Sequence, residues 1–447
     1  MLFRSAPRRL APVPLRVGPV PVLVGIGLGG LGVLILWWSN TLAVSNFAEW
    51  ITNAGRILGL LAGYGVVVLI ALMARLPPVE RGVGMDRLAR WHAMGGRYII
   101  SLITAHALLI IWGYALTAHT GVVQEAGTLV LSYPDVMMAT VAAFLLLGVG
   151  IASARAARRR LRYETWYYLH FYTYLAIALA FSHQFAVGAD FVADQPARIG
   201  WSALYLSVAA AVLWYRVVCP LRGAARHQFR VVGLSREAPG VVSVHIGGRH
   251  LDELRAEPGQ FFRWRFLTRG LWWSSNPYSL SAMPHPEVLR ITVKENGDHS
   301  GAVGRLRPGT RVIAEGPYGS LTAARTRRQV LLLAGGVGIT PLRAMFAALP
   351  GDVTLVYRAS DSRDVVFRQE LDTIARARGA RVHYLIGSRA QLGNDPLSAR
   401  RLQELVPGLH RREVYLCGPA GMMEAAVDEL RTAGVPRRRI HYESFEF

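Results

Sequence analysis

The sequence predicts three successive parts: a membrane α-helical bundle of six spans, an antiparallel β-barrel domain, and an α/β domain built on a parallel sheet. Long apolar runs that alternate with arginine-rich connections fill residues 1–226. Short strand-like runs separated by Gly and Pro fill residues 227–325, and strands alternate with helices over 326–447. With 52% hydrophobic residues among its 447, the chain is too apolar for an ordinary soluble protein.

Six segments are long and apolar enough to cross a bilayer, which takes about 20 residues each. They are residues 19–38, 54–74, 91–116, 134–152, 165–187 and 200–218. The first follows a cluster of arginines, as the apolar part of a signal peptide would, but its apolar run is long for such a peptide. We therefore interpret it as the first span.

The charges of the connections predict the orientation of the spans. Residues 39–53 and 117–133 contain no Lys or Arg, whereas the connections between them and the segment after the last span are rich in arginine. The positive-inside rule then places both termini in the cytoplasm, and we expect the protein in the plasma (inner) membrane. Cys219 and Cys417 would both be cytoplasmic, so we expect no disulfide. The net charge of +21 comes with no nucleic-acid recognition module, so we expect no nucleic-acid partner.

Four histidines lie on two of the predicted spans. His92 and His106 are fourteen residues apart on span three, and His170 and His183 are thirteen apart on span five. Both spans run outward, so His92 is level with His170 (the inner pair), and His106 is level with His183 about 20 Å further along (the outer pair). Imidazole is an axial ligand of haem iron, so the pattern predicts two bis-histidine haems stacked across the membrane. The alternative is that these are packing histidines bonded to nearby carbonyls.

The angular spacing fits span three better than span five. At about 100° per residue, fourteen residues leave His106 about 40° from the direction of His92. Thirteen residues leave His183 about 140° from the direction of His170. No Pro or Gly lies between these two to cause a kink. A straight span five would not aim both rings the same way, so it needs tilt, a change of winding or laterally offset haems.

The paired histidines on spans three and five resemble those of the ferric reductase and NADPH oxidase superfamily, and the resemblance extends over the C-terminal half. It implies two b-type haems, and the family shares the thirteen-residue spacing. The family also carries a basic residue near the outer haem. Arg56 opens span two at the outer face and would take that role, facing the haem propionates or an anionic product. The alternative is an interfacial arginine that reaches to water.

A first flavin signal, Asn276-Pro277-Tyr278-Ser279-Leu280-Ser281, lies in the predicted barrel. An aromatic ring such as that of Tyr278 stacks on an isoalloxazine, and the Ser279 hydroxyl can bond the flavin edge near its reacting nitrogen. The segment resembles the motif of ferredoxin-NADP reductase-like proteins, which reads Arg-x-Tyr-Ser in soluble members. Asn276 stands where these have the arginine that contacts the pyrophosphate, which predicts weaker flavin binding.

A second flavin signal, Lys294-x-x-Gly297-x-x-Ser300, precedes a predicted short helix at 301–306. N–H groups at a helix start favour an anion such as pyrophosphate, and Gly297 lets the chain turn close to it. Either motif alone also fits an ordinary barrel loop, but together and in this order they predict FAD. Gly316-Pro317-Tyr318-Gly319 closes the domain, as in the family.

Glycine-rich turns mark the nucleotide domain. Gly335-Gly336-Val337-Gly338-Ile339-Thr340-Pro341 follows a buried strand and opens a helix, which is typical of pyrophosphate binding. Leu416-Cys417-Gly418-Pro419 ends another strand. In the related reductases, the cysteine, the threonine and a C-terminal aromatic surround the nicotinamide. The resemblance therefore implies these roles for Cys417, Thr340 and Phe445, with Phe447 as the alternative aromatic.

The end of the next strand bears on the choice of nucleotide. Arg358 and Ser360 offer a cation and a hydroxyl, which suit the 2′-phosphate of NADPH, whereas the acidic Asp361 comes one residue late for a free ribose. We predict NADPH, with NADH as a possible substrate. The alternative for Arg358 is a solvated surface charge.

The resemblance implies an electron path from cytoplasmic NAD(P)H through FAD, then the inner and the outer haem, to an acceptor outside the membrane. The outer connections are only about a dozen residues long and offer no metal-chelate pocket, which favours O2, reduced to superoxide. Ferric or cupric ions are the alternative acceptors. A rival from another class is a membrane transporter or assembly protein with a decayed reductase, in which the four histidines would be idle.

Overall fold

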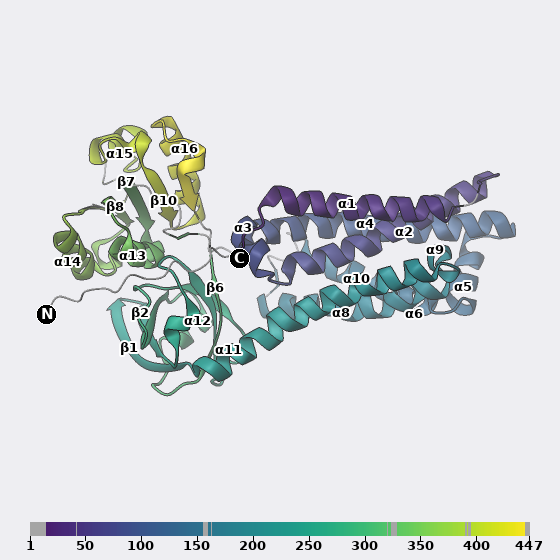
Figure 1. The fold of residues 1–447 in the computed structure, drawn as a ribbon, viewed down its shortest axis with the longest axis horizontal. Coiled ribbons are helices and arrows are strands. Elements are labelled where there is room, and N and C mark those ends of the chain that lie inside the picture. Colours follow the sequence, from purple (N-terminus) through teal and green to yellow (C-terminus); the bar gives the residue numbers. More distant parts are fainter. Residues whose placement is uncertain are drawn as a thin grey trace. The chain divides into compact units, whose positions relative to one another are not determined.

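The computed structural model describes residues 15–442 with gaps at 42, 155–159, 162, 320, 323–328, 389–390 and 392–394. The chain divides into two compact units, Met1–Arg216 and Val217–Phe447, which we name the helical unit and the sheet unit (Figure 1). The predicted boundaries between a membrane, a flavin and a nucleotide domain stay predictions.

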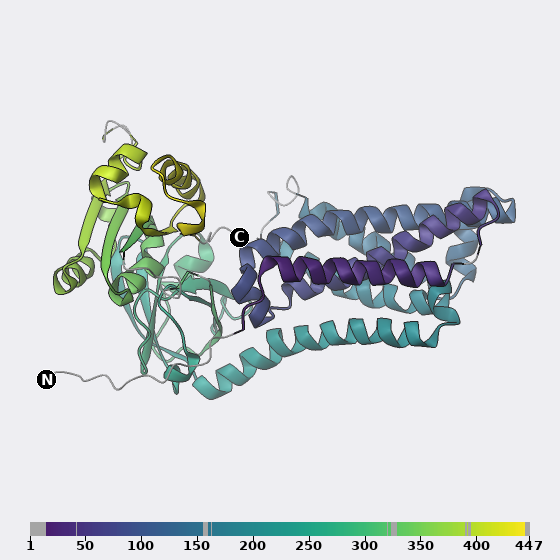
Figure 2. The same cartoon turned by 45° about the horizontal axis from the view of Figure 1, so that its top comes forward.

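The helical unit is built from long helices joined by short ones. In chain order they are α1 (Pro19–Ser39), α2 (Phe47–Met73), α3 (Pro77–Val83), α4 (Met85–Ala118), α5 (Val122–Ser132), α6 (Val136–Ser153), α8 (Tyr163–Ala186), α9 (Ala189–Val192) and α10 (Gln195–Leu213). α2 lies along α4, and α6 lies along α8 (Figures 1 and 2). A glycine stripe on α2 permits close packing: a Cβ at Gly55 would lie 3.0 Å from the Ile110 side chain of α4.

Five helices among the described residues are long and apolar enough to cross a membrane. They are Pro19–Ser39, Phe47–Met73, Arg87–Ala118, Val136–Ser153 and Gln195–His227. The remaining predicted span, residues 165–187, forms α8, which has 24 residues but carries many Tyr and His side chains that lower its hydropathy. Spanning by α8 therefore stays a prediction, as does the orientation of the bundle.

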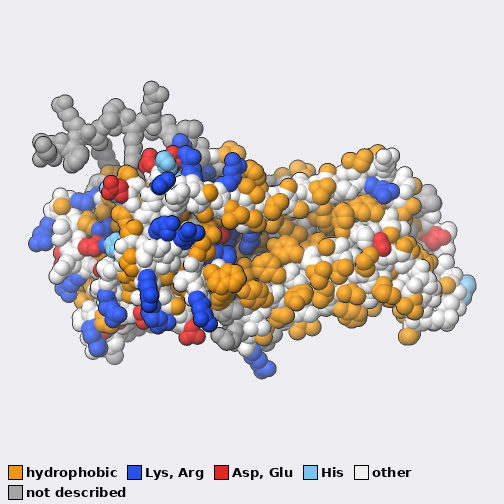
Figure 3. Space-filling view, turned by 90° about the horizontal axis from the view of Figure 1, so that it is seen from below, with side chains coloured by type: hydrophobic (Ala, Val, Ile, Leu, Met, Phe, Trp, Pro, Cys, Tyr) orange, Lys and Arg blue, Asp and Glu red, His pale blue; other side chains and the backbone are white. Residues whose placement is uncertain are grey.

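The helical unit turns its apolar side chains outward. Leu28, Phe144 and Leu206 are 62%, 69% and 67% exposed. On the face shown in Figure 3, hydrophobic side chains cover most of this unit, whereas Lys and Arg side chains gather over the sheet unit. Because helices satisfy their backbone hydrogen bonds internally, such a surface suits a hydrocarbon solvent.

The first half of the sheet unit holds two three-stranded antiparallel sheets. One contains β1 (Arg230–Ala238), β2 (Val241–Gly247) and β5 (Val288–Lys294), and the other β4 (Asn276–Ser279), β3 (Phe261–Phe266) and β6 (Val312–Tyr318). Isolated bridges, Arg230 to Arg311 and Leu280 to Ile291, link them around a core that includes the fully buried Trp264. The antiparallel strands are confirmed, but closure into a barrel is not.

The short helix after the second flavin motif begins earlier than predicted. α12 spans Asp298–Val303 instead of 301–306. Gly297, with φ of +107°, reverses the chain directly before it. The Ser300 hydroxyl accepts from the Asn296 N–H at 2.7 Å and donates to the Gly297 carbonyl at 3.1 Å. This local network fixes the helix start, which the apolar pattern alone did not reveal.

The second half of the sheet unit is a five-stranded parallel sheet, as predicted. Its strand order is β11 (Ile440–Tyr442), β10 (Glu413–Cys417), β7 (Gln329–Gly335), β8 (Asp352–Ala359), β9 (Arg381–Ile386). The helices are α13 (Ile339–Ala348), α14 (Arg368–Arg378), α15 (Ala399–Leu405) and α16 (Ala420–Thr432).

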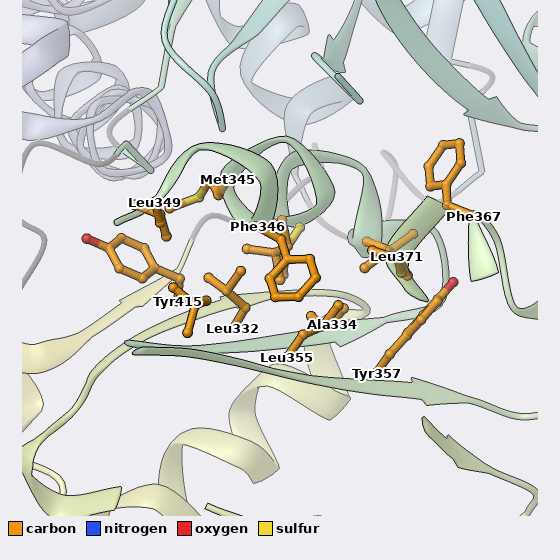
Figure 4. Packing of buried hydrophobic residues seen from close by; sticks show 14 of the residues in the cluster. Leu332, Ala334, Met345, Phe346, Leu349, Leu355, Tyr357, Phe367, Leu371 and Tyr415 are labelled. Atoms are coloured by element: carbon orange, nitrogen blue, oxygen red, sulfur yellow. The ribbon is translucent and has the colours of Figure 1, made fainter. Parts of the chain in front are cut away.

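Successive residues of β7 point to opposite faces of this sheet. Leu332 and Ala334 pack with α13 and α14 (Figure 4), while Leu331 and Leu333 pack with α15 and α16. All four are fully buried, which explains the continuous apolar run that predicted this strand.

Candidate electron-transfer site

The structure brings the inner histidine pair together. His92 on α4 and His170 on α8 have ring centroids 5.9 Å apart, with the planes inclined by 66°. The His92 Nδ1 lies 3.0 Å from the carbonyl oxygen of Leu69 on α2. His170 stacks on Trp166 at 5.3 Å, and its Nδ1 is buried without a hydrogen bond among the described residues. The side-by-side placement of these two histidines is what their positions on spans three and five predict.

The outer histidines are held by the backbone. The His106 Nδ1 lies 2.8 Å from the carbonyl oxygen of Gly55 on α2, and the His183 Nδ1 lies 2.5 Å from that of Ala180 on its own helix. A Cβ at Gly59 would lie 2.6 Å from the His106 Nδ1, so only glycine leaves room for this ring. The facing of His106 and His183 across the bundle stays a prediction.

The hydrogen bonds of His92, His106 and His183 fit metal ligation. When Nδ1 donates to a carbonyl, the proton resides there and Nε2 keeps its lone pair, which is the usual arrangement of a metal-bound imidazole. Among the described residues, no hydrogen bond reaches Nε2 of the four histidines. The backbones of α4 and α8 approach each other closely at few positions, so the inner pair meets through its side chains.

Arg56 is engaged by protein groups at the outer end of α2. It forms an ion pair with Asp190 of α9 at 2.8 Å and donates to the Asn53 side chain at 2.7 Å. Asp190 was not predicted, and only 4% of its side chain is exposed. Because Arg56 follows Gly55 in the chain, this ion pair is anchored on the same helical turn that holds His106. A role of Arg56 toward a propionate stays a prediction.

The flavin motif forms β4, which pairs with β3. Tyr278 is half-buried, the Trp264 indole donates to its carbonyl at 3.0 Å, and burial raises its phenol pKa to about 12. Pro277 and Ser279 flank it, and Ser279 is buried. The Asn276 amide lies 2.8 Å from a ring nitrogen of His299 on α12.

His299 therefore connects the two flavin motifs, because it lies between Gly297 and Ser300 in the second one. The sequence reasoning missed it. The signal that could have identified His299 is an imidazole inside the second motif. It could take the place of the arginine that the first motif lacks at Asn276. Lys294, from the same motif, lies 3.8 Å from Asp364 with both side chains about half exposed. The two motifs meet at one edge of the flavin domain, as a shared ligand would require.

The two glycine turns of the nucleotide domain meet backbone to backbone. A Cβ at Gly338 would lie 2.3 Å from the carbonyl oxygen of Cys417, and one at Gly418 would lie 3.2 Å from the backbone of Gly335. Both turns lie at the carboxyl ends of β7 and β10, where α/β sheets bind ligands.

Each of the two glycine turns leads into a helix. Gly336 has φ of +53°, and its carbonyl accepts from the buried Tyr357 hydroxyl at 3.1 Å. Thr340 lies in the first turn of α13, and Pro419 precedes α16. Cys417 is fully buried. The two turns therefore lie together, but the contact of Cys417 and Thr340 with a nicotinamide stays a prediction. Phe445 and Phe447 lie outside the described residues.

Arg358 turns toward the edge of the parallel sheet. Its guanidinium donates to the carbonyls of Ala359 and, at 3.1 Å, Leu385. Ser360 is exposed, and Asp361 accepts from Arg363 at 3.1 Å. The hydrogen bonds from Arg363 lower the pKa of Asp361 to about 2. The negative charge of Asp361 is therefore compensated by Arg363.

A charge cluster joins the flavin and nucleotide halves of the sheet unit, and sequence reasoning missed it. Glu370 of α14 contacts Arg290 of β5 at 2.7 Å and Arg343 of α13 at 2.6 Å. Arg290 also lies over the Phe367 ring at 4.7 Å. Burial works to raise the pKa of Glu370, but the hydrogen bond from Arg290 and the charge of Arg343 lower it below its ordinary 4.5.

Two protein families match this chain. Residues 58–181 match the ferric reductase like transmembrane component, and residues 332–428 match the oxidoreductase NAD-binding domain. The first range contains His92, His106 and His170 but ends before His183. One polypeptide thus joins these two parts, in the manner of a ferric reductase or NADPH oxidase-like fusion. The predicted resemblance is confirmed, and both matched families consist of oxidoreductases.

Curated relatives match the sheet unit. The ferredoxin reductase component of 3-ketosteroid-9-alpha-monooxygenase from Mycobacterium tuberculosis is 32% identical over 201 residues, 43% of this chain and 56% of the relative. A flavohemoprotein from Vibrio cholerae is 31% identical over 215 residues, 44% of this chain and 53% of that protein. The chain spans a little over half the length of these relatives.

Among solved structures, the FAD/NAD binding domain of nitric oxide dioxygenase from Vibrio cholerae is 26% identical to this chain. The match covers 49% of this chain and 98% of that one, with a TM-score of 0.41.

Proposed function

We propose that this protein carries electrons from cytoplasmic NADPH across the membrane to O2 on the outer side, which becomes superoxide. FAD and two b-type haems, when bound, would supply the hydride acceptance and the single-electron steps. The observation that carries the proposal is the facing of His92 and His170 at 5.9 Å, from two different long helices. It supports α8 as span five, which would complete the predicted six, with its histidines toward the interior of the bundle.

The role of the helical unit would be to hold the imidazole rings of the four histidines in fixed orientations. Carbonyl acceptors on α2 orient His92 and His106, so their Nε2 atoms point away from the helix that holds them. Gly59 keeps space for the outer ring, and Trp166 sets the plane of His170. A rigid bis-imidazole site needs little rearrangement when its metal changes oxidation state, which favours electron transfer.

The role of the sheet unit would be to bind FAD and the dinucleotide at adjoining edges. Tyr278 would stack on the isoalloxazine, and Ser279 would hydrogen-bond its edge. Pyrophosphate would approach the glycine turn that Gly336 opens, because backbone N–H groups at a helix start attract anions. The Glu370 cluster would hold the two halves in register for hydride transfer.

Two other functions remain to be separated from this one. A ferric or cupric reductase would use the same electron path, since only the outer acceptor differs. The short outer connections favour a small acceptor such as O2. A membrane transporter or assembly protein with a decayed reductase would have no use for four imidazoles with accessible Nε2 atoms.

The first experiment counts haem in the purified full-length protein by the pyridine haemochrome assay. We expect two haems per chain, and one or none in the wild-type protein contradicts the ligand assignment. Gly59→Ala should lose the outer haem, because its Cβ would lie 2.6 Å from the His106 ring. Gly32→Ala is the matched control, since no atom lies within 4 Å of its Cβ, and it should keep both haems.

The second experiment identifies the acceptor. Full-length protein in lipid nanodiscs receives NADPH together with O2, a ferric chelate or a cupric chelate. Superoxide is measured by reduction of cytochrome c that superoxide dismutase suppresses. Rapid superoxide formation supports the oxidase, while fast metal reduction with slow superoxide formation supports the metal reductase. Turnover of NADPH with no acceptor-dependent haem oxidation would leave the transporter or assembly alternative.

A further inference from the structure

The last long helix continues beyond its predicted end in the membrane. α10 passes through a π-helical turn (Trp214–Val218) into α11 (Cys219–His227), so that Gln195–His227 forms one helix (Figure 2). At 1.5 Å per residue, Arg222 lies about 6 Å and Arg226 about 12 Å beyond Val218, where the predicted span ends. Covalent continuity thus places both arginines at the level of lipid headgroups.

This helix end has separate apolar and basic faces. Val217 and Leu221, about 40° apart around the axis, are 44% and 56% exposed. Arg222 and Arg226 are exposed on a face that starts about 100° away from Leu221. Trp214, 46% exposed one turn earlier, is of the residue type that membrane interfaces favour. An exposed apolar stripe beside a basic face is typical of helices at a membrane interface.

The fold brings a second basic segment to this face. His227, at the end of α11, accepts from the Arg249 N–H at 2.7 Å through its carbonyl, and its Nδ1 lies 3.1 Å from the Arg249 carbonyl. Arg249, His250 and Arg255 are all exposed on that segment. Arg222, Ala225, Arg226 and His250 line an open hollow of about 630 Å³. Arg222 and Arg226 of the helix end and His250 of the second segment thus line one hollow.

One carboxylate contacts two of the residues that line the hollow. Glu253 lies 2.6 Å from the Arg226 guanidinium and 3.8 Å from the His250 ring, with 40% of its side chain exposed. The hydrogen bond and charge of Arg226 lower the pKa of Glu253. An exposed ion pair of this kind contributes little to stability, so a stronger anion can displace the carboxylate.

We propose that this hollow binds the phosphate of an anionic phospholipid in the leaflet next to the sheet unit. The helix end would lay its apolar stripe into the interface while Arg222 and Arg226 contact the headgroup, and Glu253 would compete with the phosphate. Juxtamembrane arginines attract anionic lipids in this way. The inference needs only that α10 crosses the membrane, and it is independent of the haems and of the acceptor.

The test uses full-length protein labelled at Cys219 with a polarity-sensitive fluorophore. Cys219, at the start of α11, is partly exposed, whereas Cys417, the second of the two cysteines, is fully buried. The labelled protein is reconstituted in phosphatidylcholine nanodiscs with increasing mole fractions of phosphatidylglycerol. We expect a saturable signal, with the half-maximal mole fraction about five-fold higher for each arginine removed in Arg222→Gln and Arg226→Gln.

Two further variants test the role of the carboxylate and the specificity of the response. Glu253→Gln should lower the half-maximal fraction, because the competing carboxylate is gone. Arg400→Gln removes an exposed arginine of α15, whose partner is Glu404, and should leave the titration unchanged. Bound flavin and NADPH–dye reduction check that each variant is folded.

Equal titrations for the wild type and the double variant Arg222→Gln/Arg226→Gln would overturn the proposal, as would a wild type that does not respond to phosphatidylglycerol. A last experiment adds inorganic phosphate to the labelled protein in phosphatidylcholine nanodiscs, which contain no anionic lipid. A saturable response to it would assign the hollow to a soluble phosphate compound instead of a lipid.

Discussion

The helical unit and the sheet unit place the same residue type in opposite surroundings. Leu206 on α10 is 67% exposed, whereas Leu332, Leu355 and Leu416 in the parallel sheet are fully buried. The sheet unit gathers apolar side chains away from water, and the helical unit offers them to lipid. In the helical unit, the buried polar groups are therefore few, while in the sheet unit the candidate binding residues lie on turns and in charged clusters around an apolar core.

The two units should therefore respond differently to the loss of a side chain. Loss of a histidine should remove a ligand and leave the helices in place, because long helices satisfy their backbone hydrogen bonds internally. Loss of a core leucine should weaken the whole sheet unit, because its interior is close-packed.

His170→Ala should abolish electron transfer across the membrane. It removes one imidazole of the inner pair, so the chain should bind one haem instead of two and reduce no outer acceptor. NADPH oxidation with a soluble dye should persist, because the sheet unit is untouched. His119→Ala, an exposed histidine at the end of α4, is the control and should keep full haem content. Retention of both haems in His170→Ala, measured by the pyridine haemochrome assay, contradicts the inner site.

Leu355→Ala should destabilise the sheet unit by about 2–5 kcal/mol, because it leaves a cavity among fully buried side chains (Figure 4). The temperature at which bound flavin is released, followed by its fluorescence, should fall by roughly 4–20 °C. Leu206→Ala on the exposed face of α10 is the matched variant and should shift it little. Similar shifts for both would refute the contrast between the units.

Arg358→Ala should raise the KM for NADPH about ten- to a hundred-fold, because one charge-assisted hydrogen bond to the 2′-phosphate is lost. NADH lacks this phosphate and should respond little, and turnover at saturation should stay near the wild-type value. The measurement is steady-state dye reduction with each nucleotide. Equal losses for both would mean that Arg358 supports β8 and β9 through Ala359 and Leu385, and a wild-type preference for NADH would overturn the NADPH assignment.

Glu370→Gln should cost about 1 kcal/mol, since it leaves Arg290 and Arg343 close together without their shared carboxylate. The lowered pKa of Glu370 means that its contribution is present above pH 4.5 and is lost as pH falls through the lower folded value. The difference in flavin-release temperature between the two proteins should therefore shrink as the pH falls below 4.5 toward the folded pKa of Glu370. A constant difference over this range would assign the stabilisation to another group.

The long helices and the parallel strands were predictable from the sequence, because apolar periodicity is a local property. The spacing of His92 and His106 on one helix, and of His170 and His183 on another, follows from the helical rise alone. Hydropathy failed at α8, where Tyr and His side chains lower the score although the helix is long. The start of α12 was also misplaced, because Gly297 and Ser300 set it through local hydrogen bonds.

Only the tertiary structure decided which groups meet. The carbonyls that hold His92 and His106 come from Leu69 and Gly55, on a helix whose sequence contains no signal for that role. Glu370 joins arginines from two other elements, and His299 lies beside Asn276 although 23 residues separate them. Such contacts depend on how distant segments approach one another, and neither composition nor periodicity encodes that approach. The candidate cofactor-binding residues could therefore be identified from the sequence, while the partners that orient them depend on the fold.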